Sequence, residues 1–250
     1  MKIVRLFIIP MLLAAALADD ARVTELIKRS DTEIARHHTA AALGALRAAE
    51  AIEPQTAEAL VQISKQYTEV AAATVKDPNQ SRAILEQALA CAQRALSLDP
   101  RNAKAHLSVA ICYGKLTDFV GNRTKLEYSK LIRDEAQRSI ALDPRDDFGW
   151  HVLGRWHAGI ADVGVVMKAL AKAVYGGLPE ASNEEAARCL EKAAKLAPRR
   201  IIHHAELAKV YQALGKKDAA KKEWRTVLSL PAVDEEDRNY QREAKARIGE

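Results

Sequence analysis

Cysteine, aromatic residues and long apolar runs are scarce in this chain, and each shortage excludes a class of structure. The 250 residues contain three cysteines, Cys91, Cys112 and Cys189, too few and too widely spaced for a disulfide framework or a zinc site. We expect them to be buried structural thiols. Aromatic residues make up only 5% of the chain, so alanine, leucine and valine must supply most of the packing. No alternating apolar and polar pattern is long enough to predict a β-sheet.

Catalytic and metal-binding patterns are also missing from the sequence. There is no nucleophile elbow, no glycine-rich phosphate loop and no serine, histidine and aspartate arrangement. His203 and His204 are adjacent, and neighbouring helical residues point about 100° apart, so they do not predict a zinc pair. The acidic run Asp234 to Asp237 lacks EF-hand spacing and suits a helix start. We therefore expect a protein that is not an enzyme and needs no metal or cofactor.

The charge balance does not favour nucleic acid as a partner. Lysine and arginine number 38 and aspartate and glutamate 33, which gives a formal net charge of +5. If Lys2 and Arg5 leave with an N-terminal signal, 36 basic residues remain against 33 acidic ones, or +3. A surface that binds DNA or RNA usually carries a larger, clustered positive excess.

What the sequence does have is internal repetition. Four prolines, Pro54, Pro100, Pro144 and Pro198, each stand three residues before a predicted helix. Positions four, seven, eight and eleven of these helices share one face and carry Leu60-Ile63-Ser64-Tyr67, His106-Val109-Ala110-Tyr113, Trp150-Leu153-Gly154-His157 and His204-Leu207-Ala208-Tyr211. Small or apolar residues stand twelve, eight and five positions before each proline: Ala42, Leu46, Ala49; Ala88, Ala92, Ala95; Ile132, Ala136, Ser139; and Ala186, Leu190, Ala193. These are the helix A and helix B patterns of the tetratricopeptide repeat.

We therefore predict an all-α fold, a tetratricopeptide-like solenoid of antiparallel helix pairs. A bulky residue beside a small one lets a neighbouring helix approach closely, so the expected repeat core includes Tyr67, Tyr113, Trp150, Gly154 and Tyr211. Trp150 is expected to be buried. Gly154 is expected at a close helix contact, because glycine costs about 1 kcal/mol against alanine inside a helix. Solenoids of this kind bind partners far more often than they catalyse reactions.

The spacing of the prolines predicts long helices and elaborated corners. Successive intervals are 46, 44, 54 and, to Pro231, 33 residues, whereas a plain repeat has about 34. The expected segments are an opening helix from Ala21 to Glu50, a pair from Pro54 to Val75 and Ser81 to Leu98, extra residues around Thr117 to Thr124 and Asp162 to Ser182, one long helix from Asp147 to Val174, a turn from Tyr175 to Pro179, and a closing helix from Glu235 to Ile248.

The chain also resembles a narrower family. The matching stretches are Leu153-Gly154-Arg155-Trp156, Tyr175-Gly176-Gly177-Leu178-Pro179-Glu180-Ala181-Ser182 with Glu184-Glu185-Ala186, and Leu228-Ser229-Leu230-Pro231 followed by Asp234-Glu235-Glu236-Asp237 and a last helix. Between Ile84 and Ile248 the sequence resembles the regulator of microtubule dynamics family. The resemblance implies an all-helical, non-enzymatic protein associated in animals with microtubules and spindle poles, with some members anchored at organelle membranes.

The first residues predict a targeting segment. Lys2 and Arg5 precede an apolar run from Leu6 to Leu17, and Ala16-Leu17-Ala18 before Asp19 has the form of a signal cleavage site. We expect residues 1–18 to be a signal peptide or membrane anchor and residues 19–250 to be a single tetratricopeptide-like domain. The run is too short to span a bilayer alone, because about 20 residues are needed. A mitochondrial signal and an apolar first helix packed on the array are the alternatives.

The concave surface of a tetratricopeptide array is lined by helix A positions two, five, nine, twelve and thirteen. Here these positions include the basic residues Lys104, Lys115, His151, Arg155 and Lys209, the apolar residues Leu107, Ile111, Phe148 and Ile202, and no acidic residue in the last three helices A. Such a groove suits an acidic peptide or an anionic lipid head group. The alternative is that the basic side chains only solvate a helix face. A second basic strip, Lys216, Lys217, Lys221, Lys222 and Arg225, is expected outside the groove as plain surface.

Two functions follow from these observations. The first is an adaptor whose groove holds an acidic protein segment, with tubulin and microtubules as the partner that the family resemblance implies. The second is an exported or membrane-associated helical module that binds anionic lipid or an envelope protein. The N-terminal segment favours export or membrane attachment, whereas the resemblance implies cytoplasm, cytoskeleton or spindle pole. These compartments differ because tubulin is cytosolic.

Overall fold

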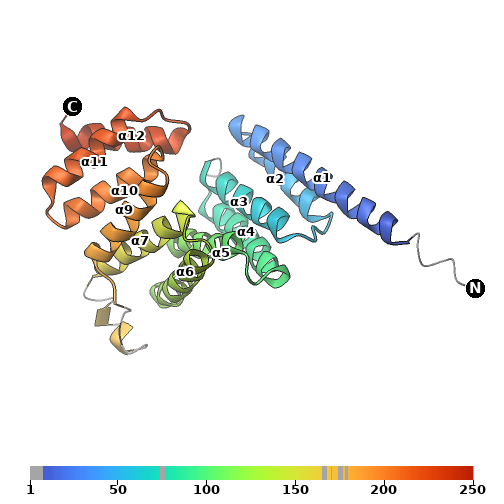
Figure 1. The fold of residues 1–250 in the computed structure, drawn as a ribbon, viewed down its shortest axis with the longest axis horizontal. Helices are drawn as coiled ribbons and strands as arrows, with labels where there is room; N and C mark the ends of the chain where they lie inside the picture. The colour runs from blue at the N-terminus through green and yellow to red at the C-terminus, as the bar shows by residue number, and fades with distance from the viewer. Residues whose placement is uncertain are drawn as a thin grey trace, which may run out of the picture. The chain divides into compact units, whose positions relative to one another are not determined.

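The protein is built of helices throughout its described part (Figure 1). The computed structural model describes residues 8–73, 77–164, 168–169, 171–173, 177 and 180–249, and these residues contain no β-strand. The predicted all-α fold is therefore confirmed. The chain divides into two compact units, unit 1 (Met1–Val120) and unit 2 (Gly121–Glu250). The predicted boundary at residue 18 and the single domain over residues 19–250 stay predictions.

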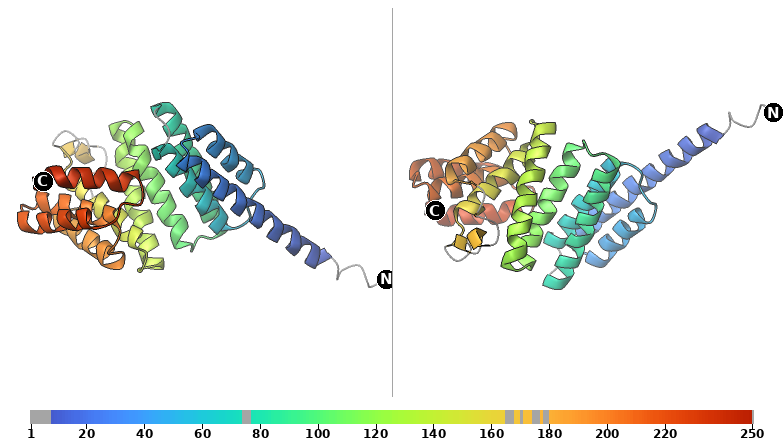
Figure 2. Two further views of the ribbon diagram at one scale, coloured as in Figure 1. Left: turned by 90° about the horizontal axis from the view of Figure 1, so that it is seen from above. Right: turned by 90° about the horizontal axis from the view of Figure 1, so that it is seen from below.

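Unit 1 is a stack of antiparallel helices. Its described elements are α1 (Ile8–Ala35), α2 (Thr39–Glu50), α3 (Ala57–Ala73), α4 (Pro78–Leu98), α5 (Ala103–Leu116) and the 3₁₀ turn η1 (Thr117–Phe119). The first helix packs against α2 and α3, α3 packs against α4, and α4 packs against α5 (Figure 2). The pair α3 and α4 confirms the predicted pair in this region.

Unit 2 continues the same arrangement within itself. Its described helices are α6 (Asn122–Leu142), α7 (Asp147–Ala161), α9 (Asn183–Leu196), α10 (Ile201–Ala213), α11 (Lys217–Ser229) and α12 (Glu235–Ile248). Each helix packs on the next along the chain, from α6 and α7 to α11 and α12, and α12 also packs on α10. The predicted turn from Tyr175 to Pro179 lies outside the described residues except for Gly177.

The predicted starts of the helices A are confirmed. The helices α3, α5, α7 and α10 begin three residues after their prolines, at Ala57, Ala103, Asp147 and Ile201. In three of them a polar side chain accepts a hydrogen bond from a backbone amide of the first turn: Thr56 from Ala59 (3.3 Å), Asn102 from Ala105 (3.0 Å) and Asp146 from Phe148 (2.9 Å). Such a cap satisfies an amide that a helix start leaves free, so the proline ends one helix and the polar residue begins the next. The closing helix also has its predicted bounds.

The predicted helix B faces are confirmed as the packed core. Every residue predicted there is buried. Gly154 shows how close the helices come, because a Cβ atom at this position would lie 2.8 Å from Cγ of Leu190 and 3.2 Å from the carbonyl oxygen of Ala186. A side chain on α7 at this point would collide with α9, so the small residue permits the contact.

Position four of the helices A has a polar role that the repeat pattern did not predict. In three repeats a ring nitrogen at this position donates to the carbonyl oxygen of the proline six residues earlier: His106 to Pro100 (3.0 Å), Trp150 to Pro144 (3.0 Å) and His204 to Pro198 (2.9 Å). The first repeat has Leu60 here, which is fully buried. These hydrogen bonds fasten each helix A to the corner that precedes it.

Trp150 is not buried as predicted, although His106 and His204 make the same hydrogen bond and are buried. Its ring reaches the proline corner and is only half-buried, and Tyr113 and Tyr211 are half-buried as well. Tyr67 and Gly154 are buried, as expected for the repeat core. The buried tryptophans are instead Trp156 and Trp224, which expose 7% and 1% of their surface.

Two predicted helices are interrupted. The predicted opening helix Ala21 to Glu50 is wrong, because α1 ends at Ala35 and His37 takes a φ of 59° before α2 begins. A left-handed residue stops a helix. The predicted long helix Asp147 to Val174 is also wrong, because α7 ends at Ala161. Gly159, Val163 and Gly164 surround this end, and glycine and valine are weak helix formers. The extra residues predicted around Thr117 to Thr124 include the 3₁₀ turn η1, which directly follows α5.

The three cysteines are free and buried, which confirms the predicted structural thiols. Burial raises the pKa of Cys112 and the pKa of Cys189 to about 11. Both thiols therefore stay protonated and weakly nucleophilic at neutral pH.

The first described helix begins at Ile8 and continues past Asp19 to Ala35. Val23 is buried where this helix packs on its neighbours. Among the described residues, no helix is both long and apolar enough to cross a membrane.

Truncating the two kinds of tryptophan should have unequal effects on stability. Trp224→Ala should lower the free energy of unfolding by about 3–5 kcal/mol, because it removes a fully buried aromatic side chain. Trp150→Ala should cost clearly less, because that side chain is only partly buried. Urea denaturation of both variants measures the difference, and equal costs would contradict the assigned burial.

Alanine should have opposite effects at two glycines of α7. Gly154→Ala should destabilise the protein by about 1–3 kcal/mol through overpacking against Leu190. Gly159→Ala is the matched control, since no neighbouring atom lies within 4 Å of the position that its Cβ would take. That change should stabilise the helix by up to about 1 kcal/mol. Thermal and urea denaturation test the pair, and a stabilising Gly154→Ala change would rule out the close contact.

Candidate functional site

The five predicted groove residues divide between the two units. Lys104 and Lys115 lie on α5 of unit 1, where both side chains are exposed. Leu107 between them is buried and Ile111 is half-buried, and the spacing of these residues puts them on one face of the helix. His151 and Arg155 lie on α7 and Lys209 on α10, all in unit 2. That all five line a single groove stays a prediction.

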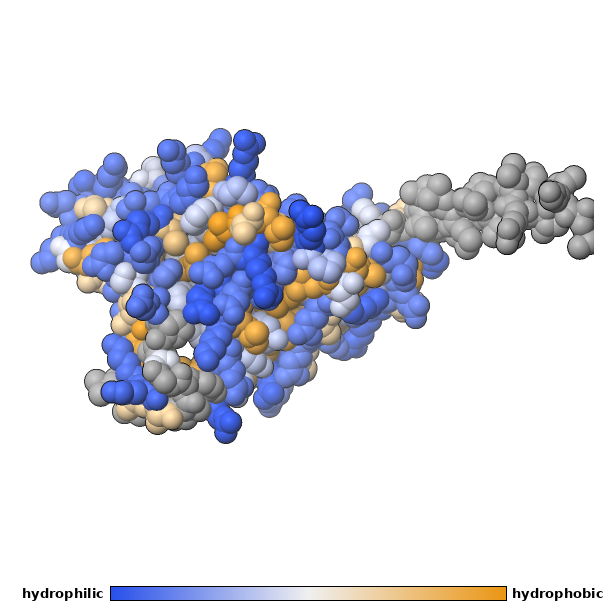
Figure 3. Space-filling view, turned by 60° about the horizontal axis from the view of Figure 1, so that its bottom comes forward, coloured by the Kyte–Doolittle hydropathy of each residue, from blue (hydrophilic) through white to orange (hydrophobic). Residues whose placement is uncertain are grey.

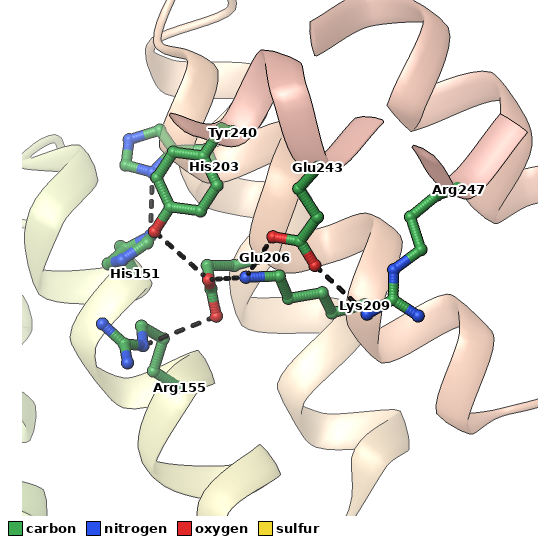
Figure 4. A network of polar contacts seen from close by, with 8 residues as sticks. All are labelled: His151, Arg155, His203, Glu206, Lys209, Tyr240, Glu243 and Arg247. Carbon is green, nitrogen blue, oxygen red and sulfur yellow. Dashed lines mark hydrogen bonds and ion pairs between the residues drawn. The ribbon is translucent and has the colours of Figure 1, made fainter. Parts of the chain in front are cut away.

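In unit 2 the predicted cations are paired with the protein's own carboxylates (Figure 4). Glu206 on α10 lies 3.5 Å from Nε of Arg155 and 3.0 Å from Nζ of Lys209. The ammonium group of Lys209 also lies 3.2 Å from Oε2 of Glu243 on α12, and Glu243 in turn pairs with Arg247 at 3.2 Å. Positive and negative groups therefore alternate from α7 through α10 to α12.

Tyr240 of α12 contacts both Glu206 and Lys209 in this network. Its hydroxyl group donates to Oε1 of Glu206 at 3.4 Å, and its ring lies 4.9 Å from Nζ of Lys209. Burial and the nearby carboxylate of Glu206 raise the pKa of Tyr240, so the hydroxyl stays a donor. We call Arg155, Glu206, Lys209, Tyr240, Glu243 and Arg247 the carboxylate network.

His151 is buried next to a second histidine rather than exposed as a groove residue. Its Nδ1 atom lies 2.9 Å from Nδ1 of His203 on α10, and the two rings are 3% and 0% exposed. Nε2 of His203 contacts Oδ2 of Asp147 at 2.7 Å, and Arg200 contacts the same oxygen at 2.9 Å. This buried chain joins α7 to α10.

The protonation of this buried chain follows from its surroundings. Burial, helped by the neighbouring His203, Arg155 and Arg200, holds the pKa of His151 well below its usual value. Burial alone would raise the pKa of Asp147, but the hydrogen bond from His203 and the charge of Arg200 lower it overall. His151 is therefore neutral and Asp147 ionised at neutral pH.

His204 has the opposite protonation preference. Its Nε2 atom faces the carbonyl oxygen of Pro198 at 2.9 Å, and its Nδ1 atom faces Oε2 of Glu223 at 2.7 Å. Both partners are acceptors, so both ring nitrogens donate only when the imidazole is charged. Burial opposes this charge, but the hydrogen bonds to Glu223 and Pro198 raise the pKa of His204 overall.

The sequence patterns missed the residues that organise this site. Glu206 and Glu243 stand outside the helix A positions expected to line a groove, so the groove was predicted without acidic residues. His203 was considered only as a neighbour of His204. The two rings point to different helices, His203 toward α7 and His204 toward α11. Over the described part of the chain, no group of three or more histidine, cysteine or acidic side chains is arranged to hold a metal ion.

The two histidine environments predict opposite pH dependences. A lowered folded-state pKa, as for His151, gives stability that is lost as the pH falls below about 6.5, where the unfolded chain takes up a proton. A raised pKa, as for His204, gives stability that is present below about 6.5 and lost as the pH rises through the folded-state value. One proton changes the free energy of unfolding by at most about 1.4 kcal/mol per pH unit.

Urea denaturation of two variants between pH 5.5 and 8 tests these signs. His151→Gln should cost most at pH 8 and less at pH 5.5, because the wild type loses the benefit of a neutral histidine on acidification. His204→Gln should cost most at pH 5.5 and less at pH 8. Trends of the same sign for both variants would contradict the assigned protonation states.

Solved structures share this architecture. A thermophilic TPR protein from Thermus thermophilus aligns with a TM-score of 0.65 at 16% identity, over 90% of this chain and 99% of that one. A Pseudomonas aeruginosa pilF structure aligns with a TM-score of 0.57 at 14% identity, over 93% of this chain and 89% of that one. At such identities the likeness concerns the fold, and it confirms the tetratricopeptide-like arrangement.

Relatives found by sequence point to one family. The mouse protein Regulator of microtubule dynamics protein 1 is 26% identical over 193 residues, which cover 77% of this chain and 63% of that protein. The human Regulator of microtubule dynamics protein 2 is 29% identical over 152 residues, which cover 60% of this chain and 37% of that protein. This chain thus spans less than two thirds of these relatives. Residues 22–250 match the family described as Regulator of microtubule dynamics protein 1-3, and the chain belongs to that family.

Proposed function

We propose that this protein is a non-enzymatic adaptor that binds an acidic segment of a partner protein. Membership of the regulator of microtubule dynamics family and the tetratricopeptide-like fold support a helical-repeat adaptor. The proposed partner is microtubules or tubulin, because the relatives are named for microtubule dynamics.

The observation that carries the proposal is the carboxylate network of unit 2. Arg155 and Lys209 stand at helix A positions nine of consecutive repeats, and each already holds the carboxylate of Glu206. Their spacing therefore suits carboxylates of an acidic ligand. The sequence-based site residues form one candidate face in each unit: Lys104 and Lys115 in unit 1, and Arg155 and Lys209 with the buried His151 in unit 2. An acidic partner would have to compete there with Glu206 and Glu243.

The surface supports recognition through charge rather than through a large apolar contact. On the face drawn in Figure 3, hydrophilic residues predominate, and hydrophobic residues form smaller areas between them. Exposed ion pairs each contribute up to about 1 kcal/mol, so several are needed for useful affinity. The alternative partner is an anionic lipid surface, which would use the same cations, and it is an outcome of the test below.

The binding test uses polymerised tubulin, a labelled polyglutamate peptide and anionic liposomes. We expect the full chain to co-sediment with microtubules and to bind the acidic peptide, and a polylysine peptide of equal length should not bind. Raising the salt concentration should weaken both complexes, because screening acts most strongly on exposed charges. Binding to liposomes alone would favour the lipid alternative, and no binding to any of the three at low salt would contradict the proposal.

A further inference from the structure

The outer face of α11 carries the most conspicuous group of unpaired cations in the described part of unit 2. Lys217, Lys221, Lys222 and Arg225 are all exposed. Within the part of the chain that the structure describes, none of the four has an ion-pair partner. The neighbouring α12 differs, because Arg238 and Arg242 both pair with Glu235.

The spacing of these cations lowers the stability of α11, and no contact among the described residues compensates for this. Lys217, Lys221 and Arg225 follow one another at spacings of four residues. Like charges at this spacing on a helix repel each other and destabilise it. Positions that violate a local rule without a structural gain are those where function is expected.

The opposite face of the helix holds these charges in fixed positions. Ala220, Trp224 and Val227 are buried, and Trp224 and Val227 belong to a hydrophobic cluster with residues of α10 and α12. The cations therefore project from a firmly packed helix. A binding surface on such an element loses little conformational freedom when a partner arrives.

The spacing of the charges indicates what kind of partner fits. Residues four apart rise about 6 Å along a helix, at 1.5 Å each. Alternate side chains of an extended peptide lie about 6.6–6.8 Å apart on one side of the strand. Three carboxylates at every second position of an extended segment can therefore meet Lys217, Lys221 and Arg225 in succession.

We propose that α11 is the docking surface for the acidic segment, which lies extended along Lys217, Lys221 and Arg225 with Lys222 beside it. This inference rests on the proposed function and names its site. Arg155 and Lys209 are already neutralised by Glu206 and Glu243, whereas the α11 cations form no ion pair with any carboxylate among the residues described. A single line of charges flanked by Asp218 suits a peptide better than a plane of lipid head groups.

Two matched triple variants test the site. One changes Lys217, Lys221 and Arg225 to glutamine, and the other changes Lys104, Arg155 and Lys209 to glutamine, so each removes three positive charges. The probes are two labelled peptides of equal composition, one with glutamate at every second position and one with the glutamates in a single block. Thermal melting confirms that both variants fold.

The α11 variant should bind the alternating peptide about tenfold or more weakly, because three exposed ion pairs are lost. The groove variant should stay within about twofold of the wild type, and the wild type should prefer the alternating peptide.

Loss of peptide binding in the groove variant alone would overturn this inference and leave the proposed function intact. Equal binding of the two peptides would overturn the extended geometry. If the wild type binds neither peptide, the proposed function itself fails. Anionic liposomes serve as a third probe. If the wild type binds the liposomes but neither peptide, and the α11 variant loses that binding, the ligand of α11 is a membrane surface and not a peptide.

Discussion

Close approach of neighbouring helices at small residues positions the polar side chains of the candidate site in unit 2. Aromatic residues are few, so contacts such as Gly154 against Leu190 set the distance between helices. In unit 2 the contact of α7 with α9 leads directly to the contact of α9 with α10. As a result α10 lies where His203 meets His151 and Glu206 meets Arg155. The polar sites of unit 2 follow from the apolar packing.

Much of this fold could be predicted because its determinants are local. A proline, a polar cap and a face of small residues lie within one repeat, so the starts of α3, α5, α7 and α10 and the bounds of α12 were predictable. The break at His37 could not be predicted, because a left-handed conformation is usually signalled by glycine and this position is a histidine. The polar role of Trp150 was not predictable either, because it donates to a backbone carbonyl, which a pattern of side chains does not show.

The candidate site was only partly predictable, because charge pairing joins residues that are distant in the sequence. Lys209 and Glu243 are far apart in the chain and meet only when α12 packs on α10. From the sequence, Lys209 and Lys221 look equally free. In the structure the first is neutralised by two carboxylates, whereas the second faces solvent. This difference changes which basic residues are expected to bind a partner.

The direct test of the packing on which this account depends is a double-mutant cycle between Gly154 and Leu190. In the wild-type background, Gly154→Ala should destabilise the protein because its Cβ meets Cγ of Leu190 at 2.8 Å. In a Leu190→Ala background, the penalty should shrink by about 1 kcal/mol or more, since coupled neighbours show interaction energies of about 0.5–3 kcal/mol. An unchanged penalty in both backgrounds would show that Leu190 does not meet Gly154 and would contradict the packing assigned at this point.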